Sequence, residues 1–329
     1  MKIGIFAPLD QFLTDIVNLW KEQGHEIMYL PSVQDPAMTL TSATQLLNSC
    51  DICWFEFCEQ LATMCSHIPA TKAKTIIRVH GLDIWEPYLQ QTNWDFFDHV
   101  VTVSPFTDEV FQMRVPAEIR PPTTMIYNGI NCDLWKMPEE RTYTKTVGIN
   151  GNIVPKKGIW YFMHVFKQVV KRDPNWILTI KGNLTQNVWK ATEVWRYWDT
   201  IVYYLKNNNM MEFIRQEERS PNFNDYMSWF WTQDLIVSSS WLEGFHFTPM
   251  QGMATGCYAL VTDWPDSDLF YPDECLYRTE AEAVEKMYNY GQLSDGEKME
   301  ISVRMREHVV NNHDIKFRER EINKLIGGD

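Results

Sequence analysis

Short apolar runs alternate with stretches of helical spacing along nearly the whole chain, and this alternation limits the folds that the sequence can adopt. The run Ile3–Ala7 ends at a loop, and residues 10–23 follow with apolar side chains spaced as on one helix face. Ser104-Pro105 marks a later helix start, since serine caps helices and proline fits their first turn. Further strand candidates are Glu26–Leu30, Ile52–Phe55, Thr75–Val79, Val100–Val103 and Thr124–Tyr127. Strands separated by helices predict a parallel sheet covered on both faces.

The same alternation begins again near residue 146. The strand candidates there are Thr146–Ile149, Trp176–Lys181, Leu235–Ser238 and Tyr258–Val261, and helical spacing covers 158–171, 187–205 and 315–326. The 329 residues are too many for one ordinary domain and suit two. We therefore expect an α/β protein with two Rossmann-like doubly wound domains that face a cleft. The expected domains are 1–138 and 139–308, followed by a C-terminal helix in 309–329 that can cross back to the first domain.

The net charge of −13 is unevenly distributed and limits the possible partners. Residues 1–140 contain 8 lysines and arginines against 18 aspartates and glutamates, whereas residues 141–329 contain 22 against 25. The acidic first half should repel DNA and anionic membrane surfaces. The second half can still hold a small anionic ligand in a local positive pocket. Nucleic acid is therefore a disfavoured partner.

The sequence also favours a reducing, cytoplasmic location. The opening residues, MKIGIFAPLD, lack the pattern of a signal peptide, and no apolar run is long enough to form a transmembrane segment. The seven cysteines are odd in number. Cys50, Cys53, Cys58 and Cys65 cluster. A zinc site typically needs two Cys-x-x-Cys pairs, and Cys58 and Cys65 do not form a second one. Reduced core thiols are the favoured interpretation, and we predict no metal site.

The stretch WLEGFHFTPMQGMATG contains a helix start. Threonine is a good helix cap and proline fits the first helical position, so Thr248-Pro249 predicts a helix that runs to Gly256. Gln251 lies three residues after the threonine and completes the pattern of a capping box. The first N–H groups of such a helix have no partner within the helix, and with the helix dipole they form a site for an anion.

The loop before this helix adds a second kind of ligand group. Gly244 lets the backbone approach a ligand closely, and Phe245 and His246 follow it. Glu243 precedes the loop, and a carboxylate beside an anion site needs a neutral hydrogen-bond donor, such as a sugar hydroxyl. A phosphorylated sugar meets both requirements.

This stretch resembles the signature of retaining GT-B glycosyltransferases of the large family 4 type. That signature reads Glu-Gly-Phe-Gly, then Pro, a second Glu, and Ala-Met-Ala-x-Gly. The matching positions are Glu243-Gly244-Phe245, Pro249, Met253-Ala254 and Gly256. Elsewhere, Ile149–Gly158 (INGNIVPKKG) resembles the family's Gly-Arg-Leu-x-Pro-x-Lys-Gly loop, and Val79–Gly81 resembles its His-Gly segment, with Val103-Ser104 and Asn128-Gly129 at further expected places. In order and spacing, the resemblance extends over nearly the whole chain.

The resemblance implies an enzyme that moves a sugar from a nucleotide-sugar donor to a hydroxyl acceptor, with retention of anomeric configuration, and without metal or cofactor. By the same resemblance, Glu243 accepts hydrogen bonds from the donor sugar, and Lys157 neutralises the diphosphate as charge develops on the leaving group. His80, from the first domain, contacts the donor sugar across the cleft. The donor-binding positions carried over are Asn152, Gly244, Phe245, His246, Thr248 and Gln251.

Three positions depart from the family pattern. Asn152 stands where the family has a phosphate-binding arginine, and Gln251 replaces its second glutamate, which commonly holds the ribose hydroxyls. Ala7-Pro8-Leu9-Asp10 replaces a glycine-rich turn. These departures keep open an alternative, a non-catalytic nucleotide-sugar-binding or partner subunit. A further alternative, a glycosyltransferase acting on nucleic-acid bases, is opposed by the acidic first half. The patterns identify neither the donor, the acceptor nor the oligomeric state.

Overall fold

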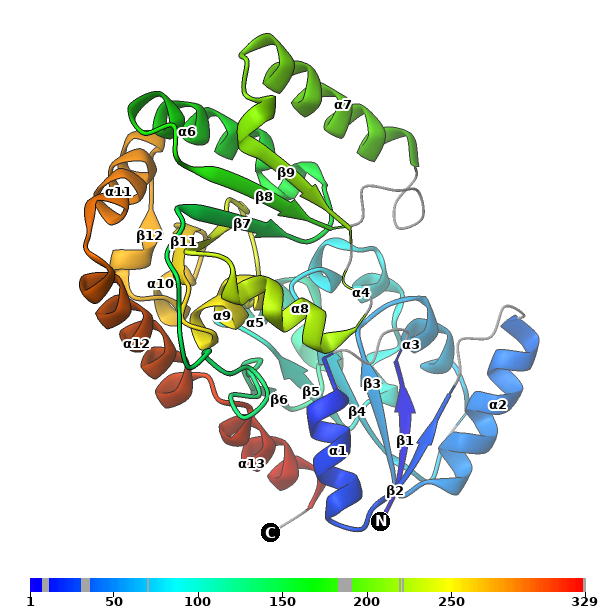
Figure 1. Cartoon of the computed structure of the whole chain (residues 1–329). Helices are drawn as coiled ribbons and strands as arrows, with labels where there is room; N and C mark the ends of the chain where they lie inside the picture. The colour runs from blue at the N-terminus through cyan, green and yellow to red at the C-terminus, as the bar shows by residue number, and fades with distance from the viewer. Residues whose placement is uncertain are drawn as a thin grey trace. The chain divides into compact units, whose positions relative to one another are not determined.

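The structure is a computed structural model that describes residues 1–7, 12–30, 36–69, 71–182, 191–218, 220 and 222–327. Contacts divide the chain into two compact units, one of Met1–Gly129 with Ile315–Asp329 and one of Ile130–Asp314. Each unit contains one six-stranded sheet whose neighbouring strands are all parallel, with helices beside it (Figure 1). The predicted α/β class with two doubly wound parallel sheets is therefore confirmed.

The sheet of the first unit has the strand order β2-β1-β3-β4-β5-β6. Its strands are β1 (Lys2–Phe6), β2 (Glu26–Tyr29), β3 (Ile52–Glu56), β4 (Lys74–Val79), β5 (His99–Thr102) and β6 (Thr123–Met125). Its helices are α1 (Thr14–Glu22), α2 (Pro36–Ser49), α3 (Gln60–Cys65), α4 (Tyr88–Gln91), α5 (Pro105–Arg114) and α13 (Ile315–Ile326), with 3-10 turns η1 (Asp83–Trp85), η2 (Trp94–Phe96) and η3 (Ala117–Ile119). The strands follow the predicted apolar runs closely.

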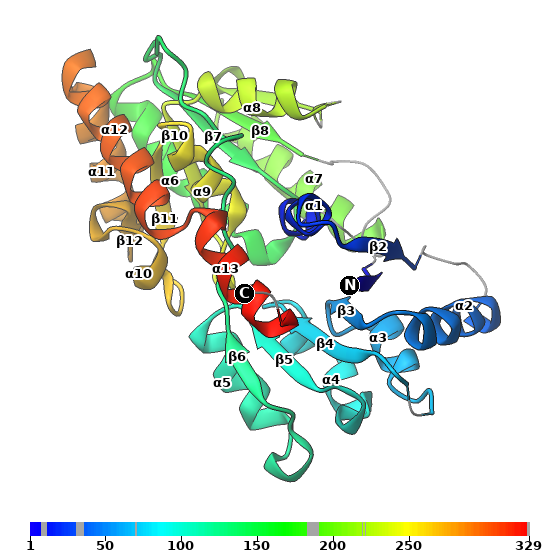
Figure 2. The same ribbon diagram turned by 90° about the horizontal axis from the view of Figure 1, so that it is seen from below.

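Both faces of this sheet are buried, as the continuous apolar runs predict. Along β3, Trp54 lies in one hydrophobic core and its neighbour Phe55 in the other. The core on the Trp54 side includes residues of α1 and α13, and the indole of Trp20 donates a hydrogen bond to Asn323 Oδ1 at 3.2 Å. Figure 2 shows α13 in red beside this sheet. The C-terminal helix thus completes the core of the first unit.

The second sheet has the strand order β12-β11-β10-β7-β8-β9. Its strands are β7 (Thr146–Asn150), β8 (Ile177–Lys181), β9 (Ile214–Glu217), β10 (Leu235–Ser238), β11 (Tyr258–Thr262) and β12 (Leu276–Tyr277). Its helices are α6 (Ile159–Arg172), α7 (Ala191–Asn207), α8 (Phe223–Trp231), α9 (Phe247–Ala254), α10 (Ser267–Phe270), α11 (Glu280–Gln292) and α12 (Asp295–Asn312), with 3-10 turns η4 (Pro155–Lys157), η5 (Met211–Phe213) and η6 (Asp273–Cys275). Along the chain, β8 and β9 are added on one side of β7, and the next strand, β10, lies on the other side of β7. In such sheets, ligands bind beyond the carboxyl ends of the strands at this switch point.

Two further findings bear on the class of protein. All seven cysteines are buried free thiols. Within the described ranges, no helix combines the length and apolar character needed to cross a membrane.

Candidate functional site

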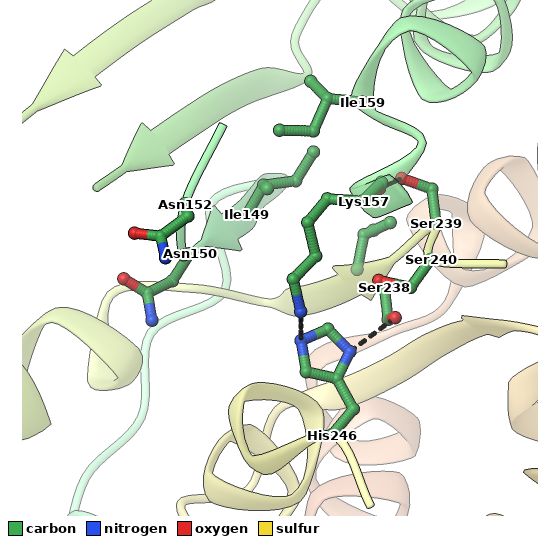
Figure 3. Close-up of a pocket in the computed structure, with 11 residues that line it drawn as sticks. Ile149, Asn150, Asn152, Lys157, Ile159, Ser238, Ser239, Ser240 and His246 are labelled. Atoms are coloured by element: carbon green, nitrogen blue, oxygen red, sulfur yellow. Dashed lines mark hydrogen bonds between the residues drawn. The ribbon is translucent and has the colours of Figure 1, made fainter. Parts of the chain in front are cut away.

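A pocket lies at the switch point of the second sheet, beyond the carboxyl ends of β7 and β10 (Figure 3). It encloses about 260 Å³, including the space at its open mouth. Asn150 lines it from the end of β7, Asn152 from the loop that follows, and Lys157 from η4. Residues 238–240, three consecutive serines, line it from β10 and the loop that follows, and His246 lines it from just before α9. The fold therefore brings the segment Ile149–Gly158 together with the segment that contains His246.

The loop that carries Lys157 is attached directly to the loop after β10. Gly158 has φ of +60°, and a Cβ there would lie 2.0 Å from the carbonyl oxygen of Ser239. The Ser239 hydroxyl donates to the carbonyl of Lys157 at 2.8 Å, and the Trp241 N–H donates to the carbonyl of Lys156 at 3.2 Å. Only glycine permits this approach, and the approach fixes the backbone from which the lysine side chains extend.

Lys157, Glu243 and His246 form one cluster beside the pocket. The Lys157 ammonium donates to Glu243 Oε1 at 2.5 Å and lies 3.3 Å from His246 Nε2, while Lys156 Nζ is 3.9 Å from Glu243 Oε2. Figure 3 shows the imidazole between Lys157 and Ser238, whose hydroxyl oxygen is 2.6 Å from His246 Nδ1. Because an ammonium has no lone pair, Nε2 must accept, and Nδ1 carries the proton that is donated to Ser238.

The charge states in this cluster follow from burial and from the lysines. Burial favours the neutral form of Glu243, but the positive charges led by Lys157 outweigh it and lower the pKa of the carboxyl to about 2. Burial, reinforced by Lys157, lowers the pKa of His246 to about 3. At neutral pH the cluster thus contains two ammonium groups including Lys156, one carboxylate and a neutral imidazole. Its single excess positive charge suits an anionic ligand.

The predicted capping box at the start of α9 is wrong. The helix begins at Phe247 with His246 as its N-cap residue, and no side chain caps it. Thr248 is therefore inside the first turn, and Gln251 lies too far along the helix to serve as the partner of a cap. The helix ends at Ala254, before the predicted Gly256, whose φ of +88° lies in the left-handed region. Proline is tolerated throughout the first turn, so the Thr-Pro pair did not fix the starting residue.

Thr248 and Gln251 make tertiary contacts instead. The Asn150 amide donates to the Tyr226 hydroxyl at 2.6 Å and to the Thr248 hydroxyl at 3.3 Å. The Tyr226 hydroxyl in turn donates to Gln251 Oε1 at 3.2 Å. These bonds join the end of β7, α8 and α9. The carbonyl oxygen of Gln251 therefore already accepts a hydrogen bond within the protein.

The Gly244–His246 loop is anchored by its aromatic residue. The ring of Phe245 is buried and packs edge-on against Phe247 and Phe270, and the Tyr271 hydroxyl donates to the carbonyl of His246 at 3.0 Å. The side chain of Phe245 is thus a core group, and the loop backbone is held in place from behind.

His80 belongs to the first unit, where it follows β4 in a buried polar network. Its Nε2 is 2.7 Å from Glu56 Oε1, and Arg78 lies 3.5 Å from the same oxygen. Burial lowers the pKa of His80, although Glu56 opposes the effect. The Asp83 carboxylate accepts from the backbone N–H groups of His80 and Cys58 at 2.8 and 2.9 Å. These contacts fix the position of the imidazole.

The structure brings several of the predicted site residues together. His80 lies in the other unit, and the side chain of Phe245 is in the core. Lys157, Glu243 and His246 meet in one cluster, and Asn152 lines the pocket together with Lys157 and His246. The turn at 7–10 lies for the most part outside the described residues. The sequence reasoning missed Lys156, Tyr226 and the serines at 238–240, although three serines directly after a buried strand were a usable signal. The binding roles of all these residues remain predictions.

No protein-family model matches the sequence, and neither does any curated protein. Solved structures do match. HepE from Anabaena, crystallised with UDP-glucose, has a TM-score of 0.75 at 14% identity, with 99% of each chain covered. A glycosyltransferase from Rickettsia africae has a TM-score of 0.72 at 13% identity, with 99% of this chain and 97% of that one covered. The chain has the GT-B fold. TarM matches with a TM-score of 0.70 at 14% identity, and the match spans 87% of this chain but 57% of TarM. At these identities the likeness shows the fold.

Proposed function

We propose that this protein is a glycosyltransferase that moves a sugar from a nucleoside-diphosphate sugar to a hydroxyl acceptor, retaining the anomeric configuration and requiring no metal. The observation that carries the proposal is the meeting of Lys157, Glu243 and His246 at the switch-point pocket. The complex of HepE with UDP-glucose supports a nucleotide-sugar donor for the shared fold. Retention of configuration rests on the resemblance of the Glu243-Gly244-Phe245 segment to the family signature.

The cluster has groups suited to both the diphosphate and the sugar of such a donor. Lys157 would neutralise the charge that develops on the departing diphosphate, where a preorganised cation lowers the barrier. Glu243 stays ionised across the physiological range because its pKa is about 2, so its oxygens can accept hydrogen bonds from sugar hydroxyls. His80 stays in the proposal as a donor-sugar contact from the first domain, on the strength of the Val79–Gly81 resemblance.

One observation favours the alternative of a non-catalytic nucleotide-sugar-binding subunit. Gln251 stands at the position of the family's second glutamate, and its carbonyl oxygen already accepts from Tyr226. Asn152 also lacks the charge of the family's arginine. Ribose and phosphate would therefore be held by fewer charged groups than in the family pattern, which weakens donor binding more directly than it affects the sugar-transfer step.

The test is donor turnover measured over a panel of nucleotide sugars, as nucleoside diphosphate released with and without hydroxyl acceptors. We expect at least one donor to turn over, and Glu243→Gln to lower kcat/KM by about 100-fold, as the loss of one preorganised transition-state contact does. Glu285→Gln is the control, because that carboxylate forms an exposed ion pair with Arg172. Unchanged turnover in Glu243→Gln would refute the role of Glu243. Donor binding without turnover for every acceptor would favour the binding subunit.

A further inference from the structure

The side chain of Ser240 carries an unexplained buried polar group. Its relative exposure is 0%, and its hydroxyl oxygen has no hydrogen-bond partner among the described residues. Nearly all buried polar groups in native proteins are hydrogen-bonded, and an unmade bond costs about 1–3 kcal/mol. Ser240 lines the pocket, and Figure 3 shows it beside Ser238. The pocket is therefore where a partner for this hydroxyl would bind.

The neighbouring hydroxyls are already used by the protein. Ser238 Oγ is 2.6 Å from His246 Nδ1, and the Ser239 hydroxyl donates to the carbonyl of Lys157 at 2.8 Å. Two of the three serines thus have structural partners, whereas Ser240 does not. Ser240 is therefore the serine whose hydroxyl is available for a ligand, whereas Ser238 and Ser239 have structural roles.

The charges around the pocket indicate what this ligand group is. Lys157 lines the pocket, while Glu243 is not among its lining residues. The Lys157 ammonium contacts both Glu243 and His246, so a positive charge lies at the pocket wall beside the carboxylate. A hydroxyl donor and an ammonium that line the same pocket, whose lining does not include the carboxylate, complement an anionic oxygen. A sugar hydroxyl would instead be matched by Glu243.

We infer that Ser240 binds the diphosphate of the donor, donating its hydroxyl proton to a phosphoryl oxygen that Lys157 also contacts. The imidazole of His246 is a positioning group in this arrangement, because its Nε2 accepts from Lys157 and its orientation is set by Ser238. The inference rests on the proposed function and adds a ligand-binding side chain to it. It divides the site into a phosphate side at Ser240 and a sugar side at Glu243.

The test is calorimetric titration of wild-type protein and Ser240→Ala with UDP, GDP and ADP in turn, and with the matching nucleotide sugar. A hydrogen bond to a charged group contributes about 1.5 kcal/mol or more, so we expect Ser240→Ala to raise the Kd of the bound nucleoside diphosphate about tenfold. Since Ser240 loses no protein partner, the Tm of the unliganded variant should be unchanged or higher. Ser302→Ala is the control: its buried hydroxyl bonds Tyr143 at 3.0 Å, so this variant should lose stability and keep its affinity.

The outcomes separate the inference from the proposed function. If wild-type protein binds none of the three diphosphates, both fail. Equal Kd values for wild-type protein and Ser240→Ala would overturn the inference alone. A loss of affinity for the nucleotide sugar without a loss for the free diphosphate would also overturn it, because Ser240 would then contact the sugar.

Discussion

Replacement of Lys157 by methionine should destabilise the second unit through the charge of Glu243. The side chain of Glu243 is 11% exposed, and its pKa falls from 4.5 to about 2 on folding. At about 1.4 kcal/mol for each pH unit, this fall corresponds to about 3 kcal/mol of stability. Lys156, at 3.9 Å, retains part of the attraction in the variant. We therefore expect Lys157→Met to lower the free energy of unfolding by about 2–3 kcal/mol at pH 7.

The pH dependence of this effect has a definite sign. Because the pKa of Glu243 is lower in the folded protein, its contribution is fully present above about pH 4.5 and is lost as the pH falls towards 2. In Lys157→Met, burial favours the protonated carboxyl, so the variant should recover part of the lost stability on acidification. The difference in unfolding free energy between wild-type protein and Lys157→Met should therefore be larger at pH 7 than at pH 4.

Native-state hydrogen exchange is the suitable assay, because it reports each unit separately. The slowest amides of β7 and β10 should lose protection in Lys157→Met, while those of β3 and β4 in the first unit should not. A double-mutant cycle with Glu243→Gln isolates the pair, with an expected coupling of about 2 kcal/mol. Arg172→Met, which breaks the exposed pair with Glu285, should cost less than about 1 kcal/mol. A coupling energy below about 0.5 kcal/mol would refute the electrostatic account of the cluster.

Two further predictions concern a glycine and a buried acid. Gly158→Ala should lower the stability of the second unit by about 3 kcal/mol or more in urea unfolding, because its φ is +60° and the new Cβ would meet the Ser239 carbonyl oxygen at 2.0 Å. Gly296→Ala, with open space at the same atom, should change stability by at most about 1 kcal/mol, and equal effects would contradict the steric argument. Burial raises the pKa of Asp83 from 3.8 to about 7, so the charged form is disfavoured by folding and the first unit should lose stability as pH rises from about 4 to 7. Asp83→Asn removes this titration, so its stability relative to wild type should improve between pH 5 and pH 8 in urea unfolding; parallel pH profiles would disprove it.

The parts of the fold that sequence patterns predict are those decided by local spacing. The buried runs became strands, and Ser104 caps α5, with its hydroxyl accepting from the Thr107 N–H at 3.1 Å. The edge strands β9 and β12 gave no such signal: β9 reads IRQE, with three polar residues, and β12 has two residues. β9 is partly exposed and lacks a continuous apolar run, whereas β12 is buried but too short for any pattern to mark it.

The sequence identified several residues of the site, but it did not predict which of them contact each other. The segments around Lys157 and Glu243 were both identified, yet these two residues are 86 positions apart, and no spacing rule states that they touch. The start of α9 was misplaced because a Thr-Pro pair fits more than one position of a first turn. Its polar groups were then taken by Asn150 and Tyr226, two partners that only the folded chain brings within reach.

The return of α13 to the first sheet means that a core begun by β1 is completed by residues more than 300 positions later in the sequence. Ile322 and Ile326 fill the same core as Ile3 and Ile5, and the Lys74 ammonium donates to the carbonyl of Leu325 at 2.7 Å. During synthesis, residues 1–129 emerge well before α13, so one face of their sheet has only α1 as cover until residues 315–326 emerge, whereas the unit 130–314 is continuous in sequence. The first unit therefore depends on contacts between residues distant in sequence, which the second unit needs less.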